Sequence, residues 1–340
     1  MVADILILLF GLVFLVKGST SLVRASTGIA KRLGISDFVI GLTLVALGTS
    51  IPELASGIVA SFQREGNLVI GNIVGANMAN IALIVGIAAL IAPLKTAETM
   101  LKRDGYIMLF ATFLFYAFAL NGTISQTEGV ILLFLYLAYI AFLFEAKSKS
   151  KRHYQFKEFL RYFLGFGFLT ALFRSTHIGR LPEREHPLEQ PSTGTFLKNF
   201  LVFTISGIAI VFGANLAVGK AIAIADFLSV PTALVGILFA LGTTLPEFSV
   251  SVAAARHGHS DIAIGNIIGS NITNIFLVIG VAASIFPLPV LKLTLFYAGP
   301  ALIVLTALLL VFIKTKWEIR RNEGVILIAL YALFLILMFL

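Results

Sequence analysis

Two stretches of the chain decide its fold, because one is a copy of the other. The first stretch, 46–94, contains Gly48-Thr-Ser-Ile-Pro-Glu53 and Gly71-Asn-Ile-Val-Gly-Ala-Asn-Met-Ala-Asn80. A shift of 194 residues places it without a gap on 240–288, which contains Gly242-Thr-Thr-Leu-Pro-Glu247 and Gly265-Asn-Ile-Ile-Gly-Ser-Asn-Ile-Thr-Asn274. Counting gives 22 identities in 49 positions, and these include the Pro, Glu and Asn residues that apolar composition alone would not align. The chain therefore contains an internal duplication, and we call 46–94 and 240–288 the first and second repeat segments.

The composition places this duplication in a membrane. Of the 340 residues, 59% are hydrophobic and 12% are charged, whereas average globular domains are about 45–50% apolar and about 25% charged. A soluble domain could not cover so much apolar surface. The net charge of +8 does not indicate a nucleic-acid partner, because most basic residues lie in short gaps between apolar runs, as the positive-inside rule describes. The chain has no Cys, which excludes disulfides and thiolate metal sites.

Apolar segments of the length needed to cross a bilayer, about 20 residues, occur ten times. They are 3–23, 36–62, 67–92, 104–121, 126–145, 198–224, 230–256, 260–286, 292–314 and 323–340. Five segments precede the central linker and five follow it. Since five is odd, the second half must enter the membrane from the opposite side, which is the inverted-repeat plan of secondary transporters. The sequence thus predicts an all-α integral membrane protein of ten transmembrane helices, built as two inverted five-helix repeats over 1–145 and 198–340.

The basic residues also predict which way the chain faces. With the N-terminus outside, the outer gaps hold only Arg64 and Lys292, and the inner gaps hold the other basic residues of the connections. Both termini are therefore expected outside the cell membrane and the linker 146–197 in the cytoplasm. Within that linker, 159–173 is apolar but short and carries Arg161. We interpret it as a segment at the inner membrane surface rather than an eleventh span.

Each repeat segment places a Pro-Glu pair in the middle of an apolar span. Pro52 has no N–H and disfavours a regular helix just before it, so carbonyl groups near Ala46 are expected to lose their helical partners. Ala240 is the corresponding residue before Pro246. In lipid, such carbonyls must be satisfied elsewhere or line a water-filled cavity. A pair of interrupted helices in corresponding positions predicts a binding site near the midplane of the membrane.

The side chains beside each Pro offer hard oxygen donors. Thr49 and Ser50 lie four and three residues before Glu53 and share roughly one helical face with it; Thr243, Thr244 and Glu247 repeat the pattern. Carboxylate, hydroxyl and carbonyl oxygens suit Ca²⁺, and Na⁺ by the same argument. Because an acidic residue at membrane depth costs at least about 2.5 kcal/mol, two at equivalent positions indicate a function. The alternative is a pair of protonated Glu residues that hold helices together.

The Asn-rich part of each repeat segment adds amides. Asn80 shares a helical face with position 76, and Asn274 shares one with Ser270, so both amides can coordinate a cation or brace the Glu residues. Asn77 and Asn271 lie on another face and are interpreted as helix-packing groups. The glycines of these strings have the GxxxG spacing that lets two helices approach closely.

The paired Gly-Thr-Ser/Thr-x-Pro-Glu and Gly-Asn-x-x-Gly-x-Asn motifs resemble the two alpha-repeats of the calcium/cation antiporter superfamily, and most closely its prokaryotic sodium/calcium exchanger branch. The resemblance covers both halves of the chain. In that family, spans two, three, seven and eight form a diamond-shaped ion site, and the first and sixth spans slide across it. The resemblance implies a ligand set of two carboxylates, five hydroxyls, two amides and two carbonyls: Glu53, Glu247, Thr49, Ser50, Thr243, Thr244, Ser270, Asn80, Asn274, Ala46 and Ala240.

The chain departs from the family pattern at two positions. Asn274 stands where many prokaryotic members carry Asp. Ala76 stands where the family usually has Ser, while Ser270 is kept in the second repeat segment. One hydroxyl ligand is thereby lost, which leaves the counter-ion open between Na⁺ and H⁺.

The two carboxylates suggest a mechanism. One Ca²⁺ would neutralise their charge, as would Na⁺ ions or protons, and a site that crosses the membrane only when loaded would enforce exchange. We therefore expect a secondary active Ca²⁺/Na⁺ antiporter that works by alternating access. The alternatives are a Ca²⁺/H⁺ antiporter of the same fold and a cation channel. An enzyme is not expected, because all five His residues lie outside the spans. Ca²⁺, Na⁺ or H⁺, and the lipid bilayer are the expected partners of a monomer without cofactors.

Overall fold

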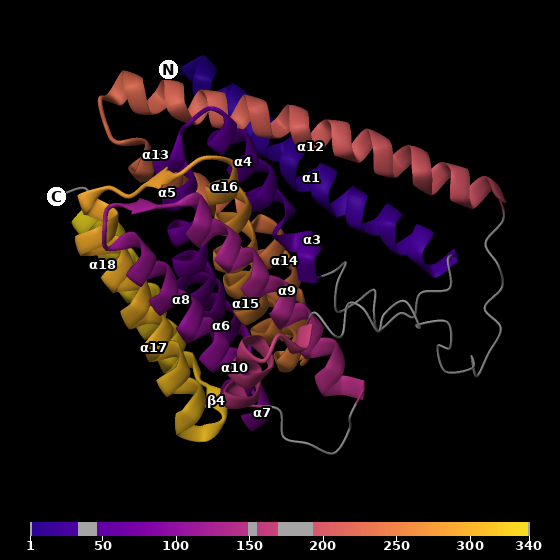
Figure 1. The fold of residues 1–340 in the computed structure, drawn as a ribbon, viewed down its shortest axis with the longest axis vertical. Coiled ribbons are helices and arrows are strands. Elements are labelled where there is room, and N and C mark those ends of the chain that lie inside the picture. The colour runs from indigo at the N-terminus through magenta and orange to yellow at the C-terminus, as the bar shows by residue number, and fades with distance from the viewer. Residues whose placement is uncertain (1, 33–45, 149–154, 169–192, 339–340) are drawn as a thin grey trace.

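The computed structural model describes residues 2–32, 46–148, 155–168 and 193–338 of the chain, and this part is almost entirely helical (Figure 1). In the labels, α marks an α-helix, η a π-helix and β a strand. The first half contains α1 (Val2–Arg32), α3 (Ala46–Thr49), α4 (Ile51–Phe62), α5 (Gly66–Met78), η2 (Ala79–Ile84), α6 (Val85–Ile91), β1 (Leu94–Lys95), α7 (Glu98–Met100), η3 (Leu101–Gly105), α8 (Tyr106–Ala119), β2 (Thr123–Ile124) and α9 (Gln126–Ser148).

The second half repeats this order of elements apart from the short helix α7. After α10 (Phe156–Leu164) it contains α12 (Thr193–Leu228), α13 (Thr232–Thr243), α14 (Leu245–Arg256), α15 (Ser260–Thr273), η5 (Asn274–Ile279), α16 (Gly280–Ile285), β3 (Leu288–Pro289), η6 (Thr294–Ala298), α17 (Gly299–Lys316), β4 (Glu318–Ile319) and α18 (Arg321–Met338). The shift of 194 residues that aligns the sequences also carries the bounds of α4 onto those of α14 and the bounds of β1 onto those of β3.

The described helices include seven that are long and apolar enough to cross a membrane, and the bent pair α13–α14 makes an eighth. The protein is therefore an all-α, multi-pass membrane protein. Two predicted spans are outside this set. The span 36–62 is described only from Ala46 on, where α4 is a shorter apolar helix. The span 104–121 corresponds to η3 and α8, and α8 alone has 14 residues.

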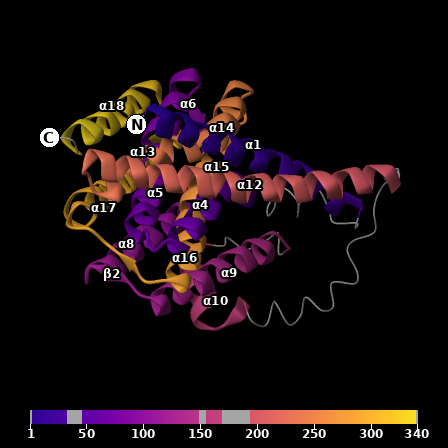
Figure 2. The same ribbon diagram turned by 90° about the horizontal axis from the view of Figure 1, so that it is seen from above.

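Two long helices lie side by side along one flank of the bundle. These are α1 and α12, which run diagonally across Figure 1 and horizontally across Figure 2. Helix α1 has 31 residues, or about 46 Å at 1.5 Å per residue, so it is longer than the predicted span 3–23. Near its start, Asp4 forms an ion pair of 2.8 Å with Lys220 of α12.

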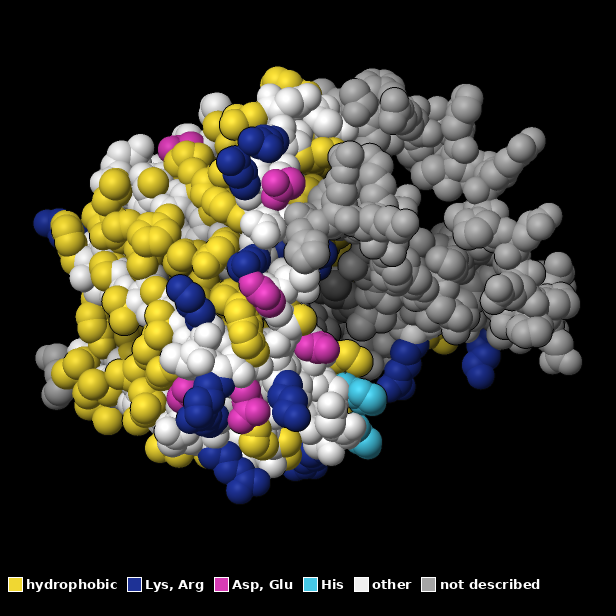
Figure 3. All heavy atoms as spheres, turned by 90° about the horizontal axis from the view of Figure 1, so that it is seen from below, with side chains coloured by type: hydrophobic (Ala, Val, Ile, Leu, Met, Phe, Trp, Pro, Cys, Tyr) yellow, Lys and Arg dark blue, Asp and Glu magenta, His cyan; other side chains and the backbone are white. Residues whose placement is uncertain are grey.

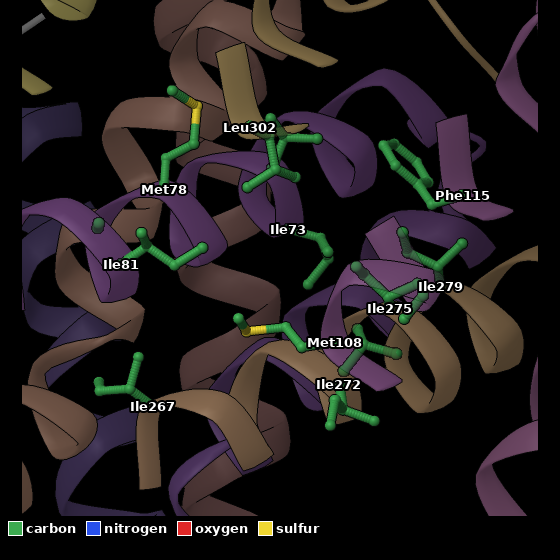
Figure 4. Close-up of a cluster of buried hydrophobic side chains, with 14 of the residues drawn as sticks. Ile73, Met78, Ile81, Met108, Phe115, Ile267, Ile272, Ile275, Ile279 and Leu302 are labelled. Carbon is green, nitrogen blue, oxygen red and sulfur yellow. The ribbon is translucent and has the colours of Figure 1, made fainter. Parts of the chain in front are cut away.

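The repeat segments form the buried centre of the molecule. The continuous helical stretches Gly66–Ile91 and Ser260–Ile285 are the most buried of the apolar helices. Their side chains, among them Ile73, Ile81, Ile272 and Ile275, fill the core with those of α8 (Figure 4). Helix α5 also packs against α13, the first half of the bent pair. The segments with the candidate ligands are therefore held on several sides.

Two short sheets join the halves. Strand β1 pairs antiparallel with β4, with Leu94 opposite Ile319. Strand β2 pairs antiparallel with β3, with Ile124 opposite Leu288. The β1–β4 sheet lies at the lower end of the molecule in Figure 1, near α7 and α10. Lys and Arg side chains gather at this end, seen from below in Figure 3.

The apolar part of the central linker forms no span within the described residues. Helix α10 has nine residues, or about 13 Å, against a hydrocarbon core of about 30 Å. Its Phe159 is buried and its ring lies edge-on to that of Phe142 in α9. The remainder of the segment 159–173 lies partly outside the described residues.

Candidate cation site

The predicted interruption is present in both repeat segments. Helix α3 ends at Thr49 and α4 begins at Ile51, while α13 ends at Thr243 and α14 begins at Leu245. The single residue between them, Ser50 or Thr244, has a ψ angle of 9° or 5° instead of the helical value. The axes of α13 and α14 differ by 43°. Proline follows at the second position of each new helix, where its missing N–H is tolerated.

The effect of the proline on the backbone differs from the prediction. The Ala240 carbonyl was expected to lose its helical partner, yet it accepts the N–H of Thr244 at 3.0 Å and the hydroxyl of Thr244 at 2.8 Å. The reason is the helical register: an N–H bonds the carbonyl four residues earlier, so Pro246 fails to donate to Gly242, not to Ala240. The roles of the Ala46 and Ala240 carbonyls as ion ligands stay predictions.

The two carboxylates lie in the first turns of α4 and α14. Glu53 and Glu247 are both fully buried, with 0% of their surface exposed, and Ser50, three residues before Glu53, contacts the carboxylate of Glu247 at 3.5 Å. Two acids from opposite halves of the chain are thus brought together in the interior. Within the described residues, no cluster of three or more His, Asp or Glu residues forms a separate metal site.

Hydroxyl groups from both repeat segments surround Glu247. Its Oε1 accepts the hydroxyl of Ser50 at 3.5 Å and that of Ser270 at 3.4 Å. The Thr49 hydroxyl lies 3.4 Å from the Ser270 hydroxyl. All of these residues are buried. The structure therefore brings Thr49, Ser50, Glu247 and Ser270 together. Their roles as ion ligands stay predictions.

The carboxylate oxygens otherwise lack donors. Within the described part of the chain, both oxygens of Glu53 and the Oε2 of Glu247 are buried without a hydrogen-bond partner. Burying carboxylate oxygens without compensation is costly. The Thr243 hydroxyl faces Glu53 but donates to Asn72 Oδ1 at 3.2 Å. The arrangement has an excess of acceptor oxygens, which is what a bound cation requires.

Two further asparagines contact residues of the candidate site and were not predicted. Asn72 accepts the Thr243 hydroxyl and donates to Ser56 Oγ at 3.3 Å. Its equivalent Asn266 donates to Ser251 Oγ at 3.1 Å and to the Glu247 carbonyl oxygen at 3.4 Å. The signal was present in the sequence, since both residues follow the first Gly of a duplicated string.

The amides of the second motif form a cross-linked group. Asn80 and Asn274 are fully buried. Asn80 Nδ2 donates to Asn271 Oδ1 at 3.0 Å, and Asn274 Nδ2 donates to Asn77 Oδ1 at 2.9 Å. Asn77 and Asn271 were interpreted as helix-packing groups, and they do lie between the packed helices. They also bind the two predicted amide ligands, which the interpretation missed.

Each of these asparagine pairs lies where the helix changes type. The π-helix η2 begins at Ala79 and η5 at Asn274. A π-helical turn contains an extra residue and is frequent at functional sites. The sequence did not predict these turns.

Comparison with known proteins identifies the family. The sequence profile of the sodium/calcium exchanger protein family matches residues 3–145 and 198–340. The sodium/calcium exchanger MaX1 of Methanosarcina acetivorans is 47% identical over 344 residues, covering 99% of this chain and 98% of the relative. Inner membrane protein YrbG of Escherichia coli is 31% identical over 282 residues, covering 83% of this chain and 79% of that protein.

A solved structure shows the same fold. The sodium-calcium exchanger NCX_Mj, soaked with 100 mM Na⁺ and 10 mM Sr²⁺, superposes with a TM-score of 0.60 at 27% sequence identity. The superposition covers 98% of this chain and 97% of that one. The profile match excludes only the central linker and the chain's first two residues. The relatives and the shared fold agree with it. The chain belongs to the sodium/calcium exchanger protein family of membrane transporters.

Proposed function

We propose that the protein exchanges Ca²⁺ for Na⁺ across the cell membrane and holds Ca²⁺ between Glu53 and Glu247. The observation that carries the proposal is the set of three buried carboxylate oxygens without a donor in the described residues. Two carboxylates carry a charge of −2, which one Ca²⁺ neutralises. The names of the relatives support Ca²⁺ and Na⁺ as the two ions.

The remaining ligands come from residues close to these carboxylates. The hydroxyls of Ser50 and Ser270 already contact Glu247, and such oxygens are the donors that Ca²⁺ and Na⁺ prefer. The Thr244 hydroxyl is directed to the Ala240 carbonyl, so it would have to turn to reach an ion. We assign the remaining ligands to the buried oxygens of Thr49, Thr243, Asn80, Asn274 and Ala240 and to the carbonyl oxygen of Ala46.

For the transport cycle we propose ten spans arranged as two inverted halves, 1–145 and 198–340, with a cytoplasmic linker at 146–197. The two small sheets support this layout. Strands β1 and β4 lie in connections that the ten-span topology places inside, and β2 and β3 lie in connections that it places outside. Each sheet therefore joins two loops of the same side. Alternating access then requires α1 and α12, which pack along each other, to move across the site.

The alternative counter-ion is H⁺. It is favoured by Ala76, which stands where Ser270 offers a hydroxyl in the second repeat segment, and by Asn rather than Asp at positions 80 and 274. Fewer oxygen ligands would support fewer Na⁺ ions. We prefer Na⁺ as the counter-ion because MaX1 and NCX_Mj, which match nearly the whole chain, are named as sodium/calcium exchangers.

Transport in proteoliposomes tests the proposal. Vesicles loaded with Na⁺ should take up ⁴⁵Ca²⁺, and imposing a proton gradient without Na⁺ should not drive uptake. Glu53→Gln and Glu247→Gln should each abolish uptake, because they remove a charge from the site. Glu98→Gln is the matched control, since Glu98 is exposed. Uptake that requires a proton gradient and ignores Na⁺ would favour the H⁺ version, and full uptake by both Glu variants would remove the site assignment.

A further inference from the structure

We infer that Asn77 and Asn271 are positioning residues that fix the orientation of the amide ligands Asn80 and Asn274. Each positioning residue belongs to the opposite repeat segment from the ligand it holds. This inference rests on the proposed function, because it treats Asn80 and Asn274 as ion ligands.

The first step is the orientation of a primary amide. An Asn side chain has a donor end, NH₂, and an acceptor end, Oδ1. In Asn80 the donor end is held by Asn271 Oδ1 at 3.0 Å. Its Oδ1 therefore points the other way, where it is buried and has no hydrogen-bond partner among the described residues. Reversing the amide would bring two oxygens together and present NH₂ to the cation, so Asn271 selects the orientation that can bind a cation.

The second step is that the same contact occurs twice. A shift of 194 residues carries Asn77 onto Asn271 and Asn80 onto Asn274. The Asn274 donor end is held by Asn77 Oδ1 at 2.9 Å, and the Asn274 Oδ1 is also buried without a partner in the described chain. In both Asn80 and Asn274, the hydrogen bond at the donor end thus explains why Oδ1 faces away and has no partner among the described residues. A hydrogen bond that merely packs two helices would not be expected to leave a free acceptor at both equivalent positions.

The third step is that the positioning residues are themselves held. Asn77 Nδ2 donates to the Asn271 carbonyl oxygen at 3.4 Å, and Asn271 Nδ2 contacts Met108 Sδ at 3.6 Å. Both side chains are 1% exposed, so water does not replace these partners. The ligand amides are consequently preorganised before an ion arrives, which reduces the ordering cost of binding.

A double-mutant cycle on the Asn80–Asn271 pair tests this role. The variants are Asn271→Ala, Asn80→Ala and the double variant, and the measurement is Ca²⁺ affinity of the purified full-length protein by titration calorimetry, with the KM for ⁴⁵Ca²⁺ uptake in proteoliposomes. Asn271→Ala should weaken Ca²⁺ binding about tenfold, the effect of losing a buried hydrogen bond. The double variant should be no weaker than Asn80→Ala alone, because Asn271 acts through Asn80.

Two further variants separate positioning from packing. Asn271→Asp keeps an acceptor for Asn80 Nδ2 and should retain an affinity well above that of Asn271→Ala. Ser61→Ala is the matched control: it also removes a buried hydrogen bond between the halves, from Ser61 Oγ to the Ala282 carbonyl oxygen at 2.7 Å, but it touches no proposed ligand. It should leave Ca²⁺ affinity unchanged. The cycle on Asn77 and Asn274 repeats the test with an independent pair.

The inference is overturned if the losses of Asn271→Ala and Asn80→Ala multiply in the double variant, or if Ser61→Ala weakens Ca²⁺ binding as much as Asn271→Ala does. These results are distinct from a failure of the proposed function. If Glu53→Gln and Glu247→Gln abolish Ca²⁺ binding but the asparagine losses multiply, only the positioning role is wrong. If both Glu variants still bind and transport Ca²⁺, the ion site itself is misplaced.

Discussion

At the scale of single residues, the two carboxylates occupy equivalent positions but have different surroundings. Glu247 Oε1 is contacted by the hydroxyls of Ser50 and Ser270. Glu53 has no hydroxyl at the position corresponding to Ser270, because that position is Ala76, which is fully buried. The two equivalent carboxylates therefore differ: Glu247 is partly hydrogen-bonded, whereas Glu53 has no donor among the residues that the structure describes.

This asymmetry predicts the effect of Ser270→Ala. The variant removes a hydroxyl from Glu247 and a ligand oxygen from the proposed ion site, so the apparent affinity for Ca²⁺ and Na⁺ should fall about fivefold, a typical effect of one hydrogen bond. The measurement is ⁴⁵Ca²⁺ uptake at graded ion concentrations. Ser249→Ala is the control, since Ser249 is exposed on the same half and its hydroxyl donates to the Leu245 carbonyl of its own helix. Equal affinities in the two variants would contradict the prediction.

The Glu53 oxygens that lack a hydrogen-bond partner within the described residues lead to a second prediction, which concerns thermal stability. In the part of the chain that the structure describes, three of the four oxygens of the two buried carboxylates have no donor, which destabilises the ion-free protein. Ca²⁺ should raise its Tm by binding only the folded state. Glu53→Gln removes one of the two charges. The ion-free variant should therefore have a Tm at or above that of the parent protein and should lose most of the Ca²⁺-dependent increase. Thermal unfolding in detergent with and without Ca²⁺ measures both, and an unchanged Ca²⁺-dependent increase would contradict the assignment.

At this scale, the duplication pointed to residues that the structure places close together, although their roles as ligands stay predictions. It paired Glu53 with Glu247 and indicated the hydroxyls of Thr49 and Ser50, while Ser270 came from the resemblance to the family. It did not predict the hydrogen bonds of Asn77 and Asn271. Helical periodicity shows which face of a helix a residue occupies, but it does not show which residue of a distant helix lies opposite. Periodicity therefore could not predict contacts between the two repeat segments.

At the scale of helices, the Pro-Glu motif correctly predicted where each span is interrupted. The motif did not specify the carbonyl group that loses its partner, which depends on the helical register at the break. It also gave no indication of the π-helices η2 and η5. Such turns insert one residue into a helix whose buried face remains apolar, so the pattern of hydrophobic residues before and after them looks uninterrupted.

The GxxxG spacing leads to a prediction about the packing of α5 on α13. A Cβ atom at Gly75 would lie 2.8 Å from Ile237 Cα and 2.9 Å from the Ile237 carbonyl oxygen, both backbone atoms that cannot yield without moving the helix. Gly75→Ala should therefore push α13 away from α5, lower the Tm by several degrees and reduce ⁴⁵Ca²⁺ uptake, because Ala240 and Thr243 lie in α13.

The matched control for this variant is Gly207→Ala. Gly207 is also a helical glycine, in α12, and no described heavy atom lies within 4 Å of a Cβ built there. Since Ala is favoured over Gly in a helix by about 1 kcal/mol, this variant should keep or slightly raise the Tm. An equal fall in the Tm of both variants would show that the close approach of the helices at Gly75 does not cause the loss of stability.

At the scale of the whole molecule, the two halves are joined by contacts between elements far apart in sequence. The sheets β1–β4 and β2–β3 and the packing of α1 on α12 all connect the first half with the second. Hydropathy and charge are local properties, and they led to the prediction of ten spans and of their direction, which stays a prediction beyond the seven or eight membrane-length helices of the described residues. They could not predict these pairings, because the strands have two residues each and carry no distinctive pattern.

The proposed inversion of the halves gives the last prediction. Gln63 and His257 occupy equivalent positions directly after α4 and α14, and both are exposed. If the halves are inverted, these equivalent residues face opposite sides of the membrane, Gln63 outside and His257 inside. The natural chain has no Cys, so Gln63→Cys and His257→Cys each introduce a single thiol without background. In intact cells, a membrane-impermeant maleimide should label the thiol of Gln63→Cys, and it should label the thiol of His257→Cys only after permeabilisation. Labelling of both thiols from the same side would contradict the inverted topology. Two halves of the same orientation would place these equivalent residues on the same side of the membrane.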